Sequence, residues 1–250
     1  MSQKYIGDTL DIHCGGQDLI FPHHENEIAQ SECACGKPFA NFWMHNGYIN
    51  VDNRKMSKSL GNFFTVREVA EKYGYEPIRY LMISSHYRSP INYSVDILEQ
   101  SQNALDRLYT CRENLVFRLE SAESGALTAD FGKFKDEFIT AMVDDLNTAD
   151  AIAAIFNLAK EINIMLGGNP SKEDCTAAVA MFVELCGVLG LVYNINKADD
   201  LDAEVEALIA QRTAARKARD FAEADRIRDQ LKSMGIVLED TPQGVKWSRA

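Results

Sequence analysis

No segment of this sequence approaches the ~18 consecutive apolar residues that a membrane-spanning helix requires. Residues 1–5 also lack the apolar core of a secretion signal. Cysteine is sparse: six cysteines are spread over 250 residues, which argues against a disulfide framework and for reduced thiols or metal ligands. These absences predict a cytoplasmic protein that does not interact with a membrane.

An excess of positive charge is missing as well, because the formal net charge is −11. Such a balance disfavours a polyanionic partner for the chain as a whole. Residues 212–232 are an exception, with seven basic and four acidic side chains. A local basic face can bind phosphates, but a solvated helix with internal ion pairs accounts for the same charges. Charge alone leaves both interpretations open and favours the ion-paired helix.

The sequence does contain enough apolar residues for a core, since 46% are hydrophobic and 25% are charged. Its length predicts one or two domains. The hydrophobic pattern divides the chain into three zones, which we take as candidate domains. They are an α/β zone over residues 1–92, a helical zone over 93–195 and a small α+β zone over 203–250.

Short alternating segments and turn residues characterise the first zone. The alternation predicts a strand over residues 9–13 that ends in the loop Cys14-Gly15-Gly16. We also expect a helix over 23–33, an extended segment over 42–51, and helices that begin at the Thr65 capping box and at Pro77.

Four apolar stripes at helical spacing predict a helical bundle in the second zone. Ser94 and Ser171 are the expected caps of its first and fourth helices, and Gly190 ends the fourth. The third zone shows one helical pattern from residue 203 to 234, followed by a β-hairpin.

The segment Lys55-Met56-Ser57-Lys58-Ser59 places two ammonium groups three positions apart, among hydroxyl groups. Ammonium groups are compact charges on flexible stems, so both can reach an anion from one side. At a phosphoryl centre they would stabilise the charge that develops as pyrophosphate leaves. An exposed basic turn without chemistry explains the same composition.

His23 and Glu27 lie four residues apart in a predicted helix, so both side chains project from one face and could bind one metal ion. A polar surface pair is the alternative. Cys33 and Cys35 offer a further, less favoured way to complete a local site. His13, at the end of a predicted strand beside two glycines, either faces a ligand or packs in the core.

The helical pattern of the third zone places Arg212, Arg216 and Arg219 on or near one stripe, with Phe221 after them. Guanidinium groups beside an aromatic ring suit phosphates and unstacked bases. A helix whose charges simply face water is the alternative.

Residues 55–59 match the signature loop of the class I aminoacyl-tRNA synthetases. Further segments resemble one family within this class, the cysteinyl-tRNA synthetases, and the resemblance extends over essentially the whole chain. The matching segments lie at residues 11–13, 15–27, 43–45, 55–67, 86–88, 145–148, 215–217, 222–225 and 234–240.

The resemblance implies a ligase that joins cysteine to tRNA-Cys with ATP and Mg²⁺. Lys58 would be the principal group that stabilises charge on ATP, with Lys55 assisting and Ser57 and Ser59 also at the nucleotide. The implied fold is part of a class I nucleotide-binding domain, then a helical tRNA-binding bundle and an anticodon-recognition module.

The resemblance also implies one zinc ion per subunit, which binds the thiol of the cysteine substrate. His23 and Glu27 correspond to two of its ligands, and the two cysteine ligands of the family precede the region matched here. His24 would support the site rather than bind the ion, because it lies ~100° further round the helix.

The same resemblance places His13 and Asp18 in the pocket for the amino acid and adenylate. Cys14 departs from the family here, since it replaces the first glycine of a His-Gly-Gly-Gly run. If that position needs a positive φ, Cys14 would strain the backbone.

For the anticodon, the resemblance assigns Arg216, Asp225 and Asp240 as reading residues and Phe221 as an aromatic that stacks. Carboxylates can accept hydrogen bonds from the amino groups of bases, which suits the two aspartates for this role.

The family's other ATP motif, His-Ile-Gly-His, occurs nowhere in the sequence. We therefore expect the C-terminal portion of such an enzyme, either a monomer or the partner of an N-terminal complementing fragment, with negligible ATP–pyrophosphate exchange alone. Two alternatives stay open. One is a non-catalytic tRNA-binding module, and the other is an ATP-dependent cysteine ligase that acts on an amino-sugar and needs no anticodon module.

Overall fold

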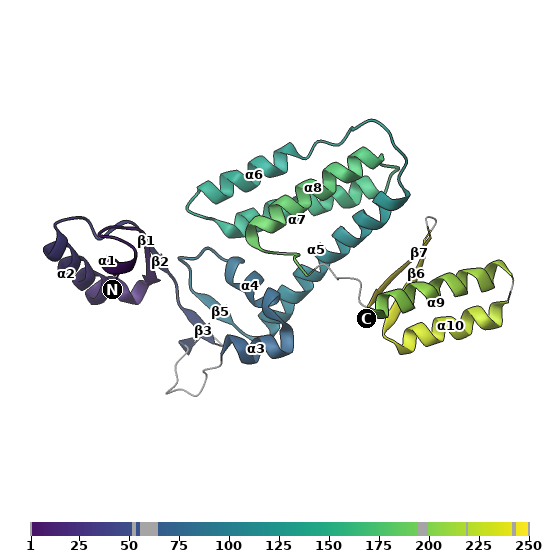
Figure 1. The fold of residues 1–250 in the computed structure, drawn as a ribbon, viewed down its shortest axis with the longest axis horizontal. Coiled ribbons are helices and arrows are strands. Elements are labelled where there is room, and N and C mark those ends of the chain that lie inside the picture. The colour runs from purple at the N-terminus through teal and green to yellow at the C-terminus, as the bar shows by residue number, and fades with distance from the viewer. Residues whose placement is uncertain are drawn as a thin grey trace.

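The computed structural model describes residues 2–51, 54–55, 65–194, 200–218, 220–241 and 244–249. An α/β part comes first, four longer helices follow, and two helices with a hairpin come last (Figure 1). This order confirms the predicted fold class. Within the described ranges, no helix is long and apolar enough to cross a membrane.

The first part is built around a β-α-β unit. Its elements are α1 (Ser2–Tyr5), β1 (Leu10–Gly16), the turns η1 (Gln17–Leu19) and η2 (Ile20–His24), α2 (Glu25–Cys35) and β2 (Ala40–Asn46). β1 runs parallel to β2, so the turns and α2 form the crossover between the two strands (Figure 1). Ile12 pairs with Phe42, and His13 pairs with Trp43.

Two predicted boundaries in this part are wrong. β1 continues through Gly16 instead of ending at His13, because both glycines pair with β2. The α-helix begins at Glu25 instead of residue 23, because Phe21 is extended (φ −132°, ψ 134°) and η2 is not a regular α-helical turn. The directions of the side chains in η2 therefore do not follow α-helical spacing.

A second sheet and two short helices follow. The sheet has the order β4-β3-β5 and contains β3 (Ile49–Val51), β4 (Arg54–Lys55) and β5 (Ile91–Tyr93). Between β4 and β5 lie α3 (Val66–Tyr73) and α4 (Tyr75–Ile83). The capping box at Thr65 is confirmed, since its hydroxyl accepts a hydrogen bond from the Glu68 backbone N–H. α4 begins at Tyr75, which places Pro77 in its first turn.

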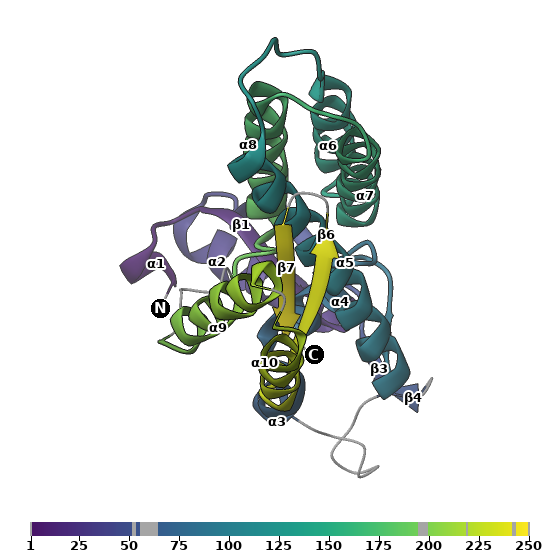
Figure 2. The same ribbon diagram turned by 90° about the vertical axis from the view of Figure 1, so that its right-hand side faces the viewer.

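The four predicted bundle helices are confirmed. They are α5 (Val95–Ser121), α6 (Gly132–Val143), α7 (Thr148–Leu166) and α8 (Lys172–Leu189) (Figure 2). The hydroxyls of Ser94 and Ser171 cap α5 and α8, and Gly190 ends α8 with a φ of 64°. The core between them consists of large apolar side chains that are almost fully buried, among them Leu105, Leu108, Leu115, Ile155, Leu158, Ile162 and Phe182.

Asp174 is a buried carboxylate at the start of α8. Its Oδ1 accepts hydrogen bonds from the backbone N–H groups of Thr128, at 2.7 Å, and Ala129, at 2.8 Å. These bonds to Ala129 and Thr128 hold the pKa of the Asp174 carboxyl far below its usual value. The side chain therefore fixes the loop before α6 against α8.

Glu76 in α4 is a second buried acidic side chain. It accepts hydrogen bonds from the Tyr109 hydroxyl, at 2.6 Å, from the Val192 backbone N–H, and from the Asn194 side-chain amide, at 3.3 Å. Val192 has a φ of 55°, which is rare for a β-branched residue. Glu76 thus holds the segment that leaves α8 in an unusual backbone conformation.

The last part contains α9 (Asp200–Lys217), α10 (Phe221–Ser233), β6 (Ile236–Thr241) and β7 (Gly244–Arg249). The hairpin of β6 and β7 is confirmed. The prediction of one helical segment is wrong, because Asp220 leaves the helical region (φ −85°, ψ 81°). Its side chain accepts a hydrogen bond from the Glu223 N–H and so begins a second helix.

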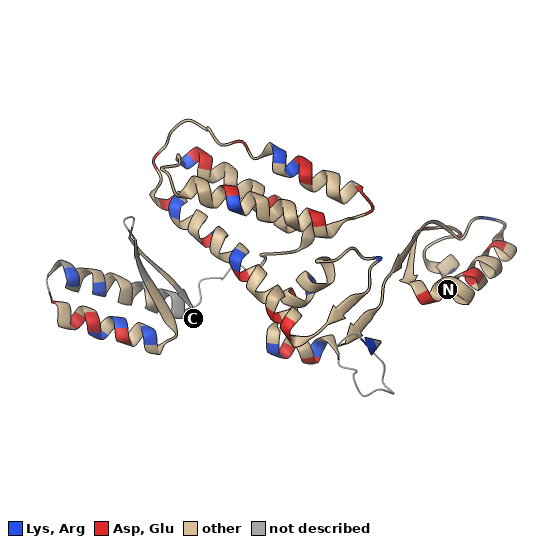
Figure 3. Ribbon diagram, turned by 180° about the vertical axis from the view of Figure 1, so that it is seen from behind, with Lys and Arg blue, Asp and Glu red and all other residues tan. Residues whose placement is uncertain are grey.

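Acidic and basic residues are interspersed along α10 (Figure 3). Arg226 pairs with Glu223 at 2.6 Å, and Arg228 pairs with Asp225 at 3.4 Å. Arg212 on α9 is only 7% exposed, so both interpretations of the arginine stripe, a surface for phosphates and a set of charges that face water, are wrong at this position. Arg219 lies outside the described residues.

Asp174→Asn should destabilise the bundle by about 1–3 kcal/mol at pH 7, because it weakens several hydrogen bonds to a buried carboxylate. The folded-state pKa is lowered, so this stabilisation is present above the unfolded pKa of about 3.9 and is lost as the pH falls below it. Urea denaturation followed by circular dichroism measures the difference.

The difference in the free energy of unfolding between wild type and D174N should therefore decrease progressively below pH ~4. Asp136→Asn, on the exposed side of α6, is the matched control and should have little effect at either pH. An equal difference in the free energy of unfolding at pH 7 and pH 2 would contradict the stabilising role of the ionised Asp174 carboxylate.

Candidate functional site

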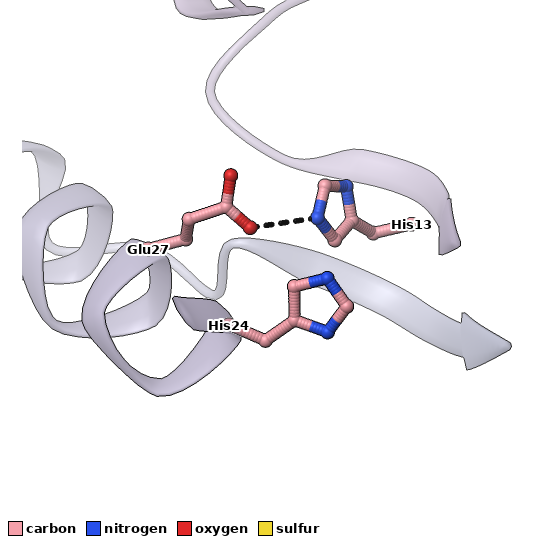
Figure 4. A group of neighbouring side chains, drawn as sticks. All are labelled: His13, His24 and Glu27. Carbon is pink, nitrogen blue, oxygen red and sulfur yellow. Dashed lines mark hydrogen bonds and ion pairs between the residues drawn. The ribbon is translucent and has the colours of Figure 1, made fainter. Parts of the chain in front are cut away.

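The candidate site lies between the β1–β2 sheet and the crossover that joins the two strands. Side chains alternate between the faces of a strand, so His13 and its partner Trp43 lie on one face with His45. The crossover returns over this face and brings His24 and Glu27 to it (Figure 4). Two short strands and one turn therefore bring together side chains that are up to 32 positions apart in the sequence.

Glu27 lies between two imidazole rings. Its Oε2 is 2.8 Å from Nε2 of His13 and is hydrogen bonded to it (Figure 4), while its Oε1 is 3.5 Å from Nε2 of His23. The structure therefore brings His23 and Glu27 together, as their spacing predicts. That these two residues bind a metal stays a prediction.

His24 is closer to the centre of the site than predicted. It is only 3% exposed, its Nδ1 lies 2.9 Å from Nε2 of His45, and its ring meets the His13 ring edge to face at 5.0 Å. Burial, together with the neighbouring His13 and His45, lowers the pKa of His24. The lowered pKa favours the neutral imidazole, which is the form that binds metals. Sequence reasoning missed this position because η2 is not a regular α-helix.

One ligand atom each from His13, His24 and Glu27 lies within 4.8 Å of the other two (Figure 4). Two imidazoles and a carboxylate are a donor set that suits Zn²⁺. The residues therefore fit the metal that the resemblance implies. His23, which the resemblance assigns as a ligand, is not one of these three, and its side chain is 59% exposed.

Gly15 makes room for the His24 ring. A Cβ atom at this position would lie 2.7 Å from Cε1 and 2.8 Å from Nε2 of His24. The close approach of the His24 ring therefore requires a glycine at this position, near the end of β1.

Cys14 does not cause the backbone strain expected of it. It lies within β1, pairs with Met44, and does not have a positive φ. Its side chain is exposed. Asp18 is also exposed, in η1, and its role in a nucleotide pocket stays a prediction.

The basic loop can be placed only by its ends. Lys55 is the last residue of β4 and pairs with Asn50 of β3. Ser57, Lys58 and Ser59, which we predicted to contact ATP, lie outside the described residues. The roles of Lys55 and Lys58 therefore stay predictions.

A polar cluster that sequence reasoning did not foresee joins the first part to the bundle. Asp145, between α6 and α7, accepts hydrogen bonds from the Tyr87 hydroxyl at 2.8 Å and from Nε of Arg88 at 2.6 Å. Arg88 and Tyr87 hold the pKa of the Asp145 carboxyl below its usual value. The Arg88 carbonyl accepts a hydrogen bond from Gln17 in η1. Sequence analysis singled out the segments 86–88 and 145–148, but it did not predict that Arg88 and Asp145 pair across 57 positions.

The predicted anticodon residues lie in the C-terminal part. Arg216 is exposed near the end of α9, and Phe221, the first residue of α10, is 63% exposed. Asp225 is exposed and paired with Arg228. Asp240 pairs with Val245 in the hairpin, and its side chain is not described.

Comparison with known proteins defines the class of the chain. Residues 1–103 match the tRNA synthetases class I (C) catalytic domain, 137–194 the DALR domain, and 198–247 the cysteinyl-tRNA ligase anticodon binding domain. LeuRS of Agrobacterium radiobacter K84, solved in a ternary complex with tRNA and LeuAMS, superposes with a TM-score of 0.56 at 23% identity, over 71% of this chain and 25% of that one. The fold is that of a class I tRNA synthetase.

Curated relatives identify the family. The cysteine–tRNA ligases of Caldicellulosiruptor saccharolyticus and Symbiobacterium thermophilum are 53% and 51% identical, over 100% of this chain and 55% of theirs. That of Bacillus pumilus is 53% identical over 100% of this chain and 54% of its own. The chain belongs to the cysteine–tRNA ligase family and spans about half the length of these relatives. The predicted resemblance is confirmed.

Gly15→Ala should disturb the site, because the buried and hydrogen-bonded His24 ring is not free to move from the new Cβ. We expect a loss of about 1–3 kcal/mol in the free energy of unfolding, measured by urea denaturation. Gly187→Ala is the control, since nothing lies within 4 Å of its Cβ, and it should be neutral or stabilise by up to about 1 kcal/mol. Equal stability of the two variants would contradict this packing.

Glu27→Gln should weaken Zn²⁺ binding by about tenfold or more, because Glu27 belongs to either possible ligand set. Competition with a chromophoric chelator at pH 7 measures the affinity. Glu25→Gln, on the exposed side of the same helix, should leave it unchanged. His13→Ala and His23→Ala then separate the two sets, and E27Q with unchanged affinity would show that neither set binds zinc.

Proposed function

We propose that this chain is part of an ATP-dependent cysteine–tRNA ligase that acts in the cytoplasm on cysteine, ATP and tRNA-Cys. The observation that carries the proposal is the order of three matched regions on one chain, from a catalytic domain to a cysteinyl-tRNA ligase anticodon binding domain. Neither alternative is favoured. A tRNA-binding module needs no catalytic region, and an amino-sugar ligase needs no anticodon region.

The proposed reaction has two steps. The carboxylate of cysteine attacks the α-phosphorus of ATP, the bond to the bridging oxygen breaks, and pyrophosphate leaves with the electron pair. A ribose hydroxyl at the end of the tRNA then attacks the carbonyl carbon of the adenylate, and AMP leaves. Lys58, with Lys55 assisting, would stabilise the charge on the leaving phosphates, and Ser57 and Ser59 would donate hydrogen bonds to them. Mg²⁺ would share this charge.

Substrate choice depends on the zinc site in this proposal. Zn²⁺ supplies strong binding of a thiolate, for which the hydroxyl of serine is a poor substitute. Glu27 would hold it, either with His23, as the resemblance implies, or with His13 and His24, which the geometry favours. Asp18 would line the same pocket. One strong bond to the substrate allows discrimination without editing.

The C-terminal part would recognise the anticodon. Phe221 and Arg216 lie at the turn between α9 and α10, where an exposed ring and a guanidinium group can contact unstacked bases. Asp225 and Asp240 would accept hydrogen bonds from base amino groups.

Arg216→Ala should weaken binding of tRNA-Cys by about tenfold, measured by fluorescence anisotropy at one fixed salt concentration. Lys232→Ala is the matched control, because Lys232 lies at the opposite end of α10 from Phe221. It should change the affinity little. If wild type binds tRNA-Cys and a variant with an altered anticodon equally, the proposed recognition is wrong.

A further inference from the structure

Segment 86–90 lies at the carboxyl edge of the β1–β2 sheet. Because β1 and β2 are parallel, both strands end at this edge, which is where ligands of open α/β sheets bind. The side chain of Gln17, directly after β1, donates a hydrogen bond to the Arg88 carbonyl at 2.9 Å. The backbone N–H of Gly47, directly after β2, donates one to the Tyr87 carbonyl at 2.8 Å. One segment therefore holds the ends of both strands.

The contact between this segment and the end of β2 is a close one. A Cβ atom at Gly47 would overlap the Ser89 carbonyl group and lie 2.7 Å from the Pro90 nitrogen. Both groups belong to the backbone, which cannot move aside as the end of a flexible side chain can. The backbone of segment 86–90 therefore packs directly against the backbone that follows β2.

The strand ends held in this way are next to the candidate metal site. Gly15 and His45 are paired in the sheet, and both contact His24. Gly15 leaves room for the His24 ring, and Nε2 of His45 lies 2.9 Å from Nδ1 of His24. Gln17 and Gly47 each follow this pair by two positions. The bonds to the strand ends therefore act two residues away from the contacts that surround His24.

The Asp145 carboxylate holds segment 86–90 from the side of the bundle. Asp145 lies between α6 and α7, and it accepts hydrogen bonds from the Tyr87 hydroxyl at 2.8 Å and from Nε of Arg88 at 2.6 Å. Tyr87 and Arg88 thus contact the strand ends through their backbone carbonyls and Asp145 through their side chains. These two residues therefore connect the bundle to the edge of the sheet.

The turn that presents Asp145 has an unusual backbone. Asp145 and Leu146 have φ values of 53° and 56°, a left-handed conformation that two consecutive non-glycine residues rarely adopt. Burial does not compensate for it, because Leu146 is 43% exposed. Residues held in such conformations cluster at functional sites. In this turn, the strained backbone accompanies a carboxylate that binds the first part of the chain.

We propose that Asp145 is a positioning residue for the candidate metal site. It acts through Tyr87 and Arg88, which fix the ends of β1 and β2 and thereby the surroundings of the His24 ring. This inference deepens the proposed function and rests on it, because it names a bundle residue that shapes the site for the cysteine substrate. Asp145 is not itself one of the candidate ligands.

The competing explanation is an ordinary surface ion pair. The side chains of Asp145 and Arg88 are 46% and 53% exposed, and exposed pairs contribute little to the free energy of unfolding. Both explanations therefore expect a variant of Asp145 to unfold at nearly the same urea concentration as wild type. They differ at the site, where only a positioning residue has an effect.

Hydrogen–deuterium exchange of the full chain, followed by mass spectrometry, tests the connection without a metal. Asp145→Asn tolerates the left-handed backbone but loses the ion pair with Arg88. It should speed exchange about threefold or more in the peptides that contain residues 15–24 and 44–47. Glu184→Gln is the matched control, because it removes an equally exposed ion pair of the bundle, with Lys135 at 2.6 Å, and should leave both peptides unchanged.

Zinc affinity tests the consequence for the site. D145N should weaken Zn²⁺ binding about three- to tenfold, less than the loss of a group bonded directly to a ligand. Gln17→Ala should have a similar effect. The double variant should lose less than the product of the two single losses, because both residues act on the same strand end. E184Q should bind Zn²⁺ as wild type does.

Unchanged exchange in D145N, or zinc losses that multiply in the double variant, would overturn the positioning role. Failure of wild type to bind Zn²⁺ would count against the proposed function instead. Faster exchange of residues 15–24 in D145N would still support the positioning role in that case, so the two proposals can fail separately.

Discussion

The parallel pairing of β1 with β2 is the constraint on which the candidate site depends. It puts His13 opposite Trp43 and leaves one face for the crossover to cover. A slip of one residue in this register would turn His13 to the other face and away from Glu27. The geometry of the site therefore depends on the register of the sheet as much as on α2, which contributes the Glu27 carboxylate. The close fit of Gly15 against His24 shows how little freedom the register has.

Acidic side chains perform a similar task elsewhere in the fold. Asp174 and Glu76 are buried and accept hydrogen bonds from backbone N–H groups of connecting segments, and Asp145 binds side chains of a loop from the first part. Each joins segments that are far apart in the sequence. These three acidic side chains therefore position connecting segments, which apolar packing alone does poorly because it is not directional.

Local signals predicted the elements that depend on local interactions. The caps at Thr65, Ser94 and Ser171 and the four amphipathic stripes gave the helices correctly, because capping and stripe formation involve neighbours within a few residues.

Features that depend on contacts between residues far apart in the sequence could not be predicted from local patterns. The burial of Arg212, the clamp on Asp145 and the central place of His24 result from tertiary packing or from an irregular turn. Helical spacing predicted His23 and Glu27 as a metal-binding pair, which stays a prediction, and the same reasoning gave His24 only a supporting role. A helix break such as that at Asp220 was visible only as a good capping residue inside an apparently continuous pattern.

The bond between Glu76 and the segment after α8 has a consequence for how the molecule responds to ionic strength. Exposed pairs such as Arg226 with Glu223 are screened when the salt concentration rises, and so is any attraction to phosphates. Glu76, shielded from solvent and bonded to Val192 and Tyr109, is screened far less. High salt should therefore weaken the exposed ion pairs and leave the segment that follows α8 in the same conformation.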